Sequence, residues 1–313
     1  MATFLSSGLL LAALLQAPPA PNDSLRAAWW ARVAADSTDA TAWLGLGRAY
    51  LRRARDYHAH GASGIDSVAA RAALDSAEQT LERAARMSGD TPAGDSARVL
   101  QLFTHGERGY LEWEAMGADA ATAVWTRIPA TLRLPPVLEE LGENLLRACP
   151  QRGILFTAQD VDTHAAWYMR FSRGLRPDLV VVPLARWRGD SVFRRRLLRA
   201  ELQDVPRPVS LRSLGQSRAL CASMGFERPP QPPGATGGEL SWNKRPLVWV
   251  AGRERRGDRV PAQDFVFAAL RLAVDQQETW TAPALTLYRR AADNVSDLCR
   301  PLRTFGLRDE VGC

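Results

Sequence analysis

The period of the hydrophobic positions changes near the middle of the chain. Up to about residue 148, apolar side chains recur every three to four positions, a spacing that predicts amphipathic helices. Beyond residue 149, short apolar runs that predict strands alternate with segments of helical period. The runs occupy residues 153–158, 178–184 and 245–251. Because they are rich in Val, Leu and Ile on both faces and are separated by helices, they predict a mostly parallel sheet. The expected fold is an all-α region (23–148) followed by a small α/β domain (149–313).

Further elements are expected around these runs. The helical segments of the second half are residues 163–174, 191–202, 214–224, 262–278 and 284–302. A short strand is expected at 209–211, and residues 227–243 form an irregular loop because proline and glycine are frequent there.

The first 22 residues differ from the rest in composition. Residues 4–15 are an apolar block, and no charged side chain occurs before Asp23. The block has the length of a signal-peptide core and is shorter than the roughly 20 apolar residues that span a bilayer. Residues 1–22 therefore predict a signal peptide or an uncleaved N-terminal anchor, and hence a periplasmic or secreted protein. An apolar tail without a targeting role is the alternative.

One helical segment of the first half carries a recognisable motif. Trp43, Leu46, Gly47 and Tyr50 share one face at helical spacing, and the segment 77–84 supplies a matching second helix before Pro92. The pattern resembles a tetratricopeptide repeat, and a generic helical hairpin bundle is the alternative. The resemblance implies a concave surface for a protein or peptide partner. The residues expected to contact it are Trp43, Tyr50 and Tyr57.

The net charge of the chain and the placement of its basic residues limit the kinds of partner that we expect. The chain has a net charge of +6 at pH 7, and Lys244 is its one lysine among 40 basic residues. Basic runs are not interleaved with the aromatic residues that stack on bases, so a nucleic-acid partner is not expected. Modest attraction to anionic surfaces remains, which allows peripheral contact with a membrane.

The four cysteines are not arranged as a metal site. They form no C-x-x-C pair and lie at no metal-ligand spacing with histidine, so zinc is not expected. In an exported protein Cys299 would pair with Cys313, and Cys149 with Cys221. Free thiols are the alternative.

The candidate chemistry lies after the first predicted strand, at Asp160, Asp162, Thr163 and His164. The carboxyl ends of parallel strands meet at one edge, so the loops that follow the other two strands should join these residues. Those loops contribute Arg186, Trp187, Arg188, Arg253 and Arg255. Arginines can clamp a phosphorylated or acidic saccharide, two carboxylates can hold a divalent cation, and His164 could act as a general base. The alternative for Asp162 and Thr163 is capping of the next helix.

The same region resembles a known family. The strand 154–158, the acids at 160 and 162, Trp167 and Tyr168, and the turn Gly174-x-Arg176-x-Asp178 are similar to the soluble region of bacterial protein-O-mannosyltransferase-like envelope proteins. The resemblance implies the fold and an envelope location. It departs at Gln159 and Val161, and the sequence shows no multi-span membrane region, so transferase activity is not implied.

These features predict an exported, non-enzymatic envelope protein. Its helical repeats would bind a protein partner, and its α/β domain would have a ligand-binding role without a cofactor other than a divalent cation. The alternative is an envelope enzyme that acts on a phosphorylated or glycosidic substrate through Asp160 and Asp162.

Overall fold

The computed structural model describes residues 21–59, 66–205, 210–231, 240–254 and 259–313. Most of the predicted signal peptide or anchor, Val209 and Arg255 lie outside these ranges, as does much of the predicted loop at 227–243. Within the described residues, no helix combines the length and the apolar character needed to cross a membrane.

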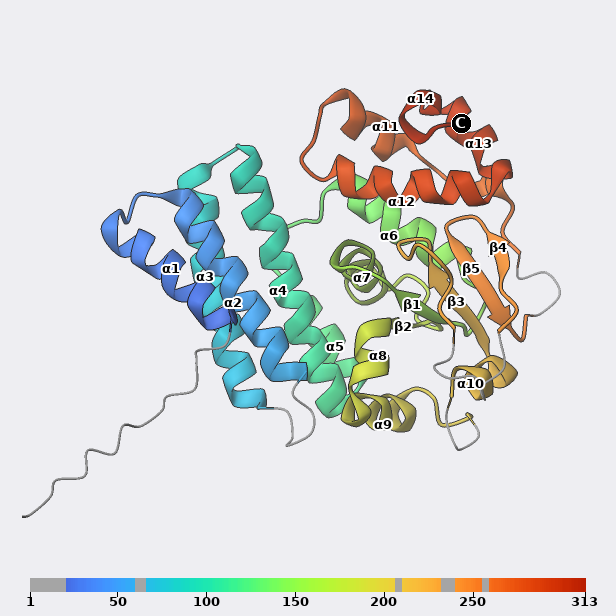
Figure 1. Cartoon of the computed structure of the whole chain (residues 1–313), viewed down its shortest axis with the longest axis horizontal. Coiled ribbons are helices and arrows are strands. Elements are labelled where there is room, and N and C mark those ends of the chain that lie inside the picture. The colour runs from blue at the N-terminus through green and yellow to red at the C-terminus, as the bar shows by residue number, and fades with distance from the viewer. Residues whose placement is uncertain (1–20, 60–65, 206–209, 232–239, 255–258) are drawn as a thin grey trace, which may run out of the picture.

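The first half is helical, as expected, and its helices α1 to α5 lie side by side, whereas α6 packs against α7 and the helices of the second half (Figure 1). They are α1 (Pro21–Ala35), α2 (Ala40–Ala59), α3 (Ser67–Ser88), α4 (Pro92–Met116), α5 (Ala118–Trp125) and α6 (Pro136–Ala148). Side chains set their starts: Asp66 caps α3 through the amide of Ala69, and Thr91 caps α4 just before Pro92.

The motif in α2 fixes the distance to α3. A Cβ added at Gly47 would lie 2.5 Å from Leu81 Cγ, so only glycine lets the two helices approach this closely. Leu46 and Leu81 are fully buried there. The predicted pairing of these two helices is present, whereas their membership of a repeat array stays a prediction.

The second half contains a five-stranded sheet. Its strands are β1 (Ile154–Thr157), β2 (Val180–Pro183), β3 (Ala219–Ser223), β4 (Asn243–Arg245) and β5 (Val248–Gly252), in the order β2-β1-β3-β5-β4. β1 runs parallel to β2 and β3, but β5 runs antiparallel to β3 and to β4. The sheet is mixed, so the expectation of a mostly parallel sheet is wrong. Parallel strands need a long crossover, usually a helix, and the described part of the β3–β5 connection contains none.

Several sequence-predicted elements differ from the structure. The helix expected at 214–224 is split into α10 (Leu211–Ser217) and β3, and Leu211, expected in a strand, starts α10. Ser210 caps α10, and Arg218 has an extended backbone that leads into β3. The helix expected at 262–278 is a 3-10 turn (Ala262–Asp264) followed by α11 (Ala268–Asp275).

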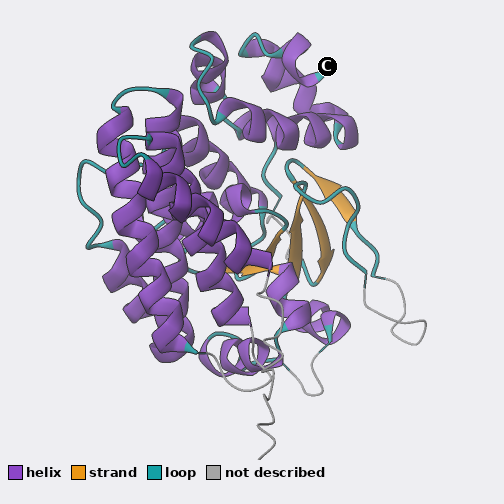
Figure 2. Ribbon diagram, turned by 60° about the vertical axis from the view of Figure 1, so that its left-hand side comes forward, coloured by secondary structure: helices purple, strands orange, loops and turns teal. Residues whose placement is uncertain are grey.

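The remaining helices lie on one side of the sheet and beyond its ends, and α11 to α14 form a group beyond one of these ends (Figures 1 and 2). They are α7 (Asp160–Trp167), which continues as a π-helical turn (Tyr168–Ser172), α8 (Leu184–Gly189), α9 (Ser191–Ala200), α12 (Thr281–Asn294), α13 (Cys299–Thr304) and α14 (Arg308–Val311). A 3-10 turn (Ser296–Leu298) separates α12 from α13, where one long helix was expected.

Both considered cysteine pairings are present. Cys149 is bonded to Cys221 and Cys299 to Cys313, with Cα–Cα distances of 5.8 and 5.4 Å. The first bond attaches the end of α6 to β3, and the second attaches the chain end to α13.

The main hydrophobic core extends through both halves, and two small clusters lie within the helical half. One continuous cluster of buried side chains extends from Leu51 of α2 to Val311 of α14 and includes the central strand β1. The boundary expected near residue 148 therefore does not separate two independent cores.

Candidate functional site at the seam

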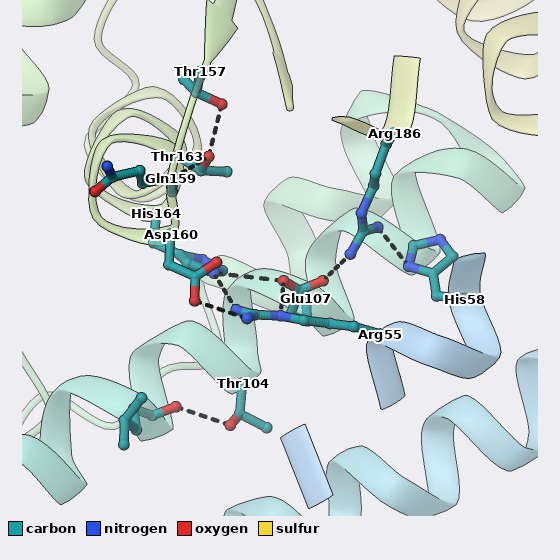
Figure 3. A network of polar contacts seen from close by, with 11 residues as sticks. Arg55, His58, Thr104, Glu107, Thr157, Gln159, Asp160, Thr163, His164 and Arg186 are labelled. Atoms are coloured by element: carbon teal, nitrogen blue, oxygen red, sulfur yellow. Dashed lines mark hydrogen bonds and ion pairs between the residues drawn. The ribbon is translucent and has the colours of Figure 1, made fainter. Parts of the chain in front are cut away.

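Charged side chains from both halves meet in a partly buried cluster at the seam, the contact between the helical half and the α/β half next to the carboxyl end of β1 (Figure 3). α2 contributes Arg55 and His58, α4 contributes Glu107, α7 contributes Asp160 and His164, and α8 contributes Arg186. We call these six residues the seam cluster.

Glu107 lies at its centre. Its Oε1 accepts a hydrogen bond from Arg55 Nε at 2.8 Å and its Oε2 accepts one from Arg186 Nη2 at 2.5 Å. Burial raises the pKa of Glu107, but the guanidinium groups of Arg186 and Arg55 outweigh it and hold the pKa well below its usual range. Each oxygen of this buried carboxylate is thus occupied by a cation from a different half of the chain.

Arg186 extends the cluster to a second acid. Its Nη1 donates to His58 Nδ1 at 2.7 Å, and its guanidinium lies 4.5 Å from the ring centroid of Tyr110. An arginine can only donate, so Nδ1 accepts and the proton of neutral His58 is on Nε2. Nε2 in turn donates to the buried carboxylate of Glu114.

His164 is enclosed rather than open to a substrate. It is 2% exposed, and its ring stacks on Phe103 at 4.2 Å between centroids. Its Nε2 lies 3.2 Å from Arg55 Nη2 and 3.5 Å from Glu107 Oε1. Burial lowers the pKa of His164, so the imidazole is neutral at pH 7. A general base must reach a substrate proton, and this geometry does not support that role.

The two aspartates of the D-x-D sequence diverge. Asp160 keeps 58% of its side chain exposed and accepts from Arg55 Nη1 at 2.8 Å. Asp162 is buried, and its oxygens accept the backbone N–H groups of Ala158 at 2.9 Å and Gln159 at 2.8 Å. Burial raises the pKa of Asp162. The pair does not converge on one point where a cation could sit.

The capping alternative describes the turn well. Gln159 and Asp162 form a reciprocal capping box at the start of α7. Thr163 Oγ1 contacts the Gln159 carbonyl at 2.6 Å and Thr157 Oγ1 at 2.7 Å, so its hydroxyl is also used internally.

The predicted ligand clamp is only partly assembled. Arg186 reaches the seam cluster, Trp187 is buried with its ring edge-on to Phe156, and Arg188 donates to the Gln231 carbonyl at 2.9 Å. Arg253 follows β5, which is antiparallel, so it lies at the opposite rim of the sheet and is exposed there. The expectation that all three loops meet at one edge is wrong for this reason.

The aromatic residues expected to contact a partner pack within the helical region. Trp43 donates to the Ser37 carbonyl at 3.0 Å and lies under Arg83. The rings of Tyr50 and Tyr57 lie against Arg26 and Arg53. All three are half-buried, so each keeps some surface exposed.

Arg55, His58 and Glu107 were not among the predicted site residues. The available signal was Glu107 itself, a carboxylate on the same helical face of α4 as Phe103 and Tyr110, where burial demands a cationic partner. The partners could not be named because they come from α2 and α8, far away in sequence.

Neither a metal-binding group nor a similar protein indicates a particular reaction. The described part of the chain contains no group of three or more His, Cys, Asp or Glu side chains placed to hold a metal ion. Comparison of the chain with protein-family models, curated proteins and solved structures returned no match.

Two surface hollows lie away from the seam cluster. The junction groove has a volume of about 520 Å³ and lies where α4, the segment 130–136 and the start of α12 meet. The C-terminal hollow has a volume of about 760 Å³ and lies between the segment 259–263 and the turn that leads into α13.

Proposed function

We propose that this chain is an exported cell-envelope binding protein without catalytic activity, whose tetratricopeptide-like helical region receives a protein or peptide partner. The α/β region serves as the rigid base of that surface. The observation that carries the proposal is the junction groove, because it is formed by the helical region together with the connector to the α/β region and by residues 278–280, just before α12.

The lining of the groove has the composition of a recognition surface. Its apolar part consists of Val99, Leu134, Pro135, Pro136 and Trp280, and its charged rim of Asp95, Arg98, Arg133 and Glu278. Aromatic and arginine side chains dominate the binding energy of protein interfaces, usually inside a polar rim. An extended peptide with apolar residues and at least one acidic side chain, which would face Arg133, fits this arrangement.

The seam cluster supports a non-catalytic role for the other candidate site. Asp162 and His164 are buried and have internal partners, and Asp160 is paired with Arg55. The alternative, an envelope enzyme acting on a phosphorylated or glycosidic substrate through Asp160 and Asp162, has less support because a substrate would have to displace these contacts.

Export is supported by the cysteines. All four are paired in disulfides, which persist in oxidising compartments and are rare in the cytosol. The apolar N-terminal segment of the sequence agrees with this location.

The test blocks the groove without disturbing the core. Thr131 and Thr279 are exposed in its lining, so Thr131→Arg with Thr279→Arg fills it with bulky side chains. The matched control is Thr122→Arg with Thr126→Arg, two exposed positions on and just after α5. Affinity capture from envelope extracts followed by mass spectrometry should recover a partner with wild type and control, and lose it with the blocked variant. Equal recovery by all three proteins would rule out the groove as the partner site.

A further inference from the structure

The C-terminal hollow has a distinct charge pattern. One wall carries Arg259, and the other carries Arg300 and Arg303, against a single acid, Asp297. Arg300 and Arg303 are three residues apart on α13, so they lie on the same face of that helix. All three arginines are exposed.

Two of these guanidinium groups are not neutralised within the described chain. No carboxylate of the described residues pairs with Arg259 or Arg300, whereas Arg303 Nη2 donates to the backbone oxygen of Cys313, the last residue of the sequence, at 3.2 Å. At the seam, in contrast, Arg55 and Arg186 are both bonded to Glu107. The hollow therefore presents two unpaired cationic forks to solvent, each able to take a carboxylate or phosphate bidentately, together with the remaining N–H groups of Arg303.

The other lining groups suit hydroxyl groups rather than further charge. Gln263, Ser296 and Asp297 offer amide, hydroxyl and carboxylate oxygens for hydrogen bonds, and Pro261 and Pro301 provide small apolar surfaces. The volume of about 760 Å³ exceeds what a single inorganic anion fills and accommodates one or two sugar rings.

We propose that the C-terminal hollow binds an acidic saccharide, with Arg259, Arg300 and Arg303 on its anionic groups and Gln263, Ser296 and Asp297 on its hydroxyls. This site is separate from the junction groove and adds a glycan ligand to the proposed partner binding. Carboxylate and phosphate groups share the chemistry that the arginines recognise.

The wall that carries two of the arginines is held in place. Leu298 and Leu302 are fully buried on either side of Cys299, and the Cys299–Cys313 disulfide attaches this helix to the chain end. Binding therefore requires little ordering of the backbone, which favours affinity.

Calorimetric titration of the full chain tests the site with three probes. Trigalacturonate carries carboxylates, glucose 6-phosphate carries a phosphate, and maltotriose is neutral. At low ionic strength we expect at least one anionic probe to bind and maltotriose not to bind. The preferred anionic probe identifies the group that the arginines recognise.

Two double variants distinguish specific binding in the C-terminal hollow from non-specific attraction of an anion to a positively charged protein. Arg300→Ala with Arg303→Ala should lower the affinity for the anionic probe by about tenfold or more, since two charge-assisted contacts are lost. Arg195→Ala with Arg199→Ala removes the same charge from exposed positions of α9 and should leave affinity within about twofold. Failure of both anionic probes to bind, equal binding of maltotriose, or equal losses in the two variants would overturn the proposal. None of these outcomes depends on the partner of the junction groove.

Discussion

At the scale of single residues, Glu107 has the largest expected effect on stability. Glu107→Gln removes the one carboxylate shared by Arg55 and Arg186, which leaves Arg186 without a carboxylate partner and Arg55 with Asp160 alone. Breaking a buried pair from one side typically costs about 3–5 kcal/mol. Urea denaturation should show a loss of this order. The control Glu82→Gln breaks the exposed pair with Arg86 and should cost less than about 1 kcal/mol. Equal losses would show that the seam cluster contributes nothing special.

His164 predicts how stability depends on pH. Burial keeps its folded-state pKa below the value in the unfolded chain, about 6.5, although the carboxylates of Glu107 and Asp160 act in the other direction and Arg55 acts with burial. The unfolded state therefore binds a proton first as pH falls. The contribution of neutral, buried His164 to the free energy of unfolding is therefore complete above pH 6.5. It is lost below pH 6.5, by up to about 1.4 kcal/mol per pH unit.

His164→Gln keeps an acceptor for Arg55 and removes this titration. The free energy of unfolding, measured by urea denaturation between pH 7.5 and 5, should depend less on pH in the variant than in the wild type. Burial also lowers the pKa of His105, which adds to the loss of stability at low pH, and raises the pKa of Glu140 to about 7, which opposes that loss, so the effect of His164 is the difference between the slopes of the two proteins. Identical slopes in both proteins would contradict a neutral, buried His164.

At the scale of elements, the disulfides differ in the length of chain they close. Cys149–Cys221 spans 72 residues and Cys299–Cys313 spans 14. Loop entropy predicts stabilisation of about 4 and about 3 kcal/mol respectively. Thermal unfolding of Cys149→Ala with Cys221→Ala should therefore show a larger drop in Tm than Cys299→Ala with Cys313→Ala. A larger drop for the shorter loop would mean that local packing, rather than chain entropy, sets the effect.

The elements also show what the sequence could and could not predict. β1, α7 and β2 were predictable because apolar runs of Val, Leu and Ile flank helix-capping residues there, although α7 begins at Asp160 rather than at residue 163 and is buried from Asp162 to Trp167. β3 was not, since Ala219–Ser223 has few β-branched residues and is buried on both faces, which hides any alternation. With β3 missed, the antiparallel direction of β5 could not be inferred. The sequence did contain one indication of this direction. No helix is predicted in the segment before β5, and a strand that pairs in parallel with its predecessor needs a crossover, usually a helix.

The candidate site illustrates the same limit at longer range. Asp160, His164 and Arg186 were named from local sequence, and the structure places all three in the seam cluster. Their main partner is Glu107 or Arg55, which are separated from them by 79 to 109 residues and belong to other helices. Motif spacing carries no information on such contacts. The prediction of an open ligand clamp was therefore incomplete, because it omitted the partners from α2 and α4.

At the scale of the whole molecule, the main core and the seam cluster connect the two halves, so we expect them to unfold as one cooperative unit. α4 is the central element: its residues Phe103, Tyr110 and Trp113 belong to the same buried cluster as β1 and α12. A repeat domain that folds independently would instead bury its apolar face within its own helices.

This arrangement predicts that the helical half does not fold stably alone. A fragment of residues 21–148 would expose Phe103, Tyr110 and Trp113 and leave Glu107 paired only with Arg55, without Arg186. We expect weak, broad thermal unfolding by circular dichroism and binding of a hydrophobic dye, whereas the full chain should unfold in a single sharp transition. The fragment with Phe103→Ser is a useful comparison, because it should bind less dye if the exposed seam is the cause. A sharp, dye-free transition of the unmodified fragment would show that the helices are an autonomous domain and that the seam is only a contact between two domains.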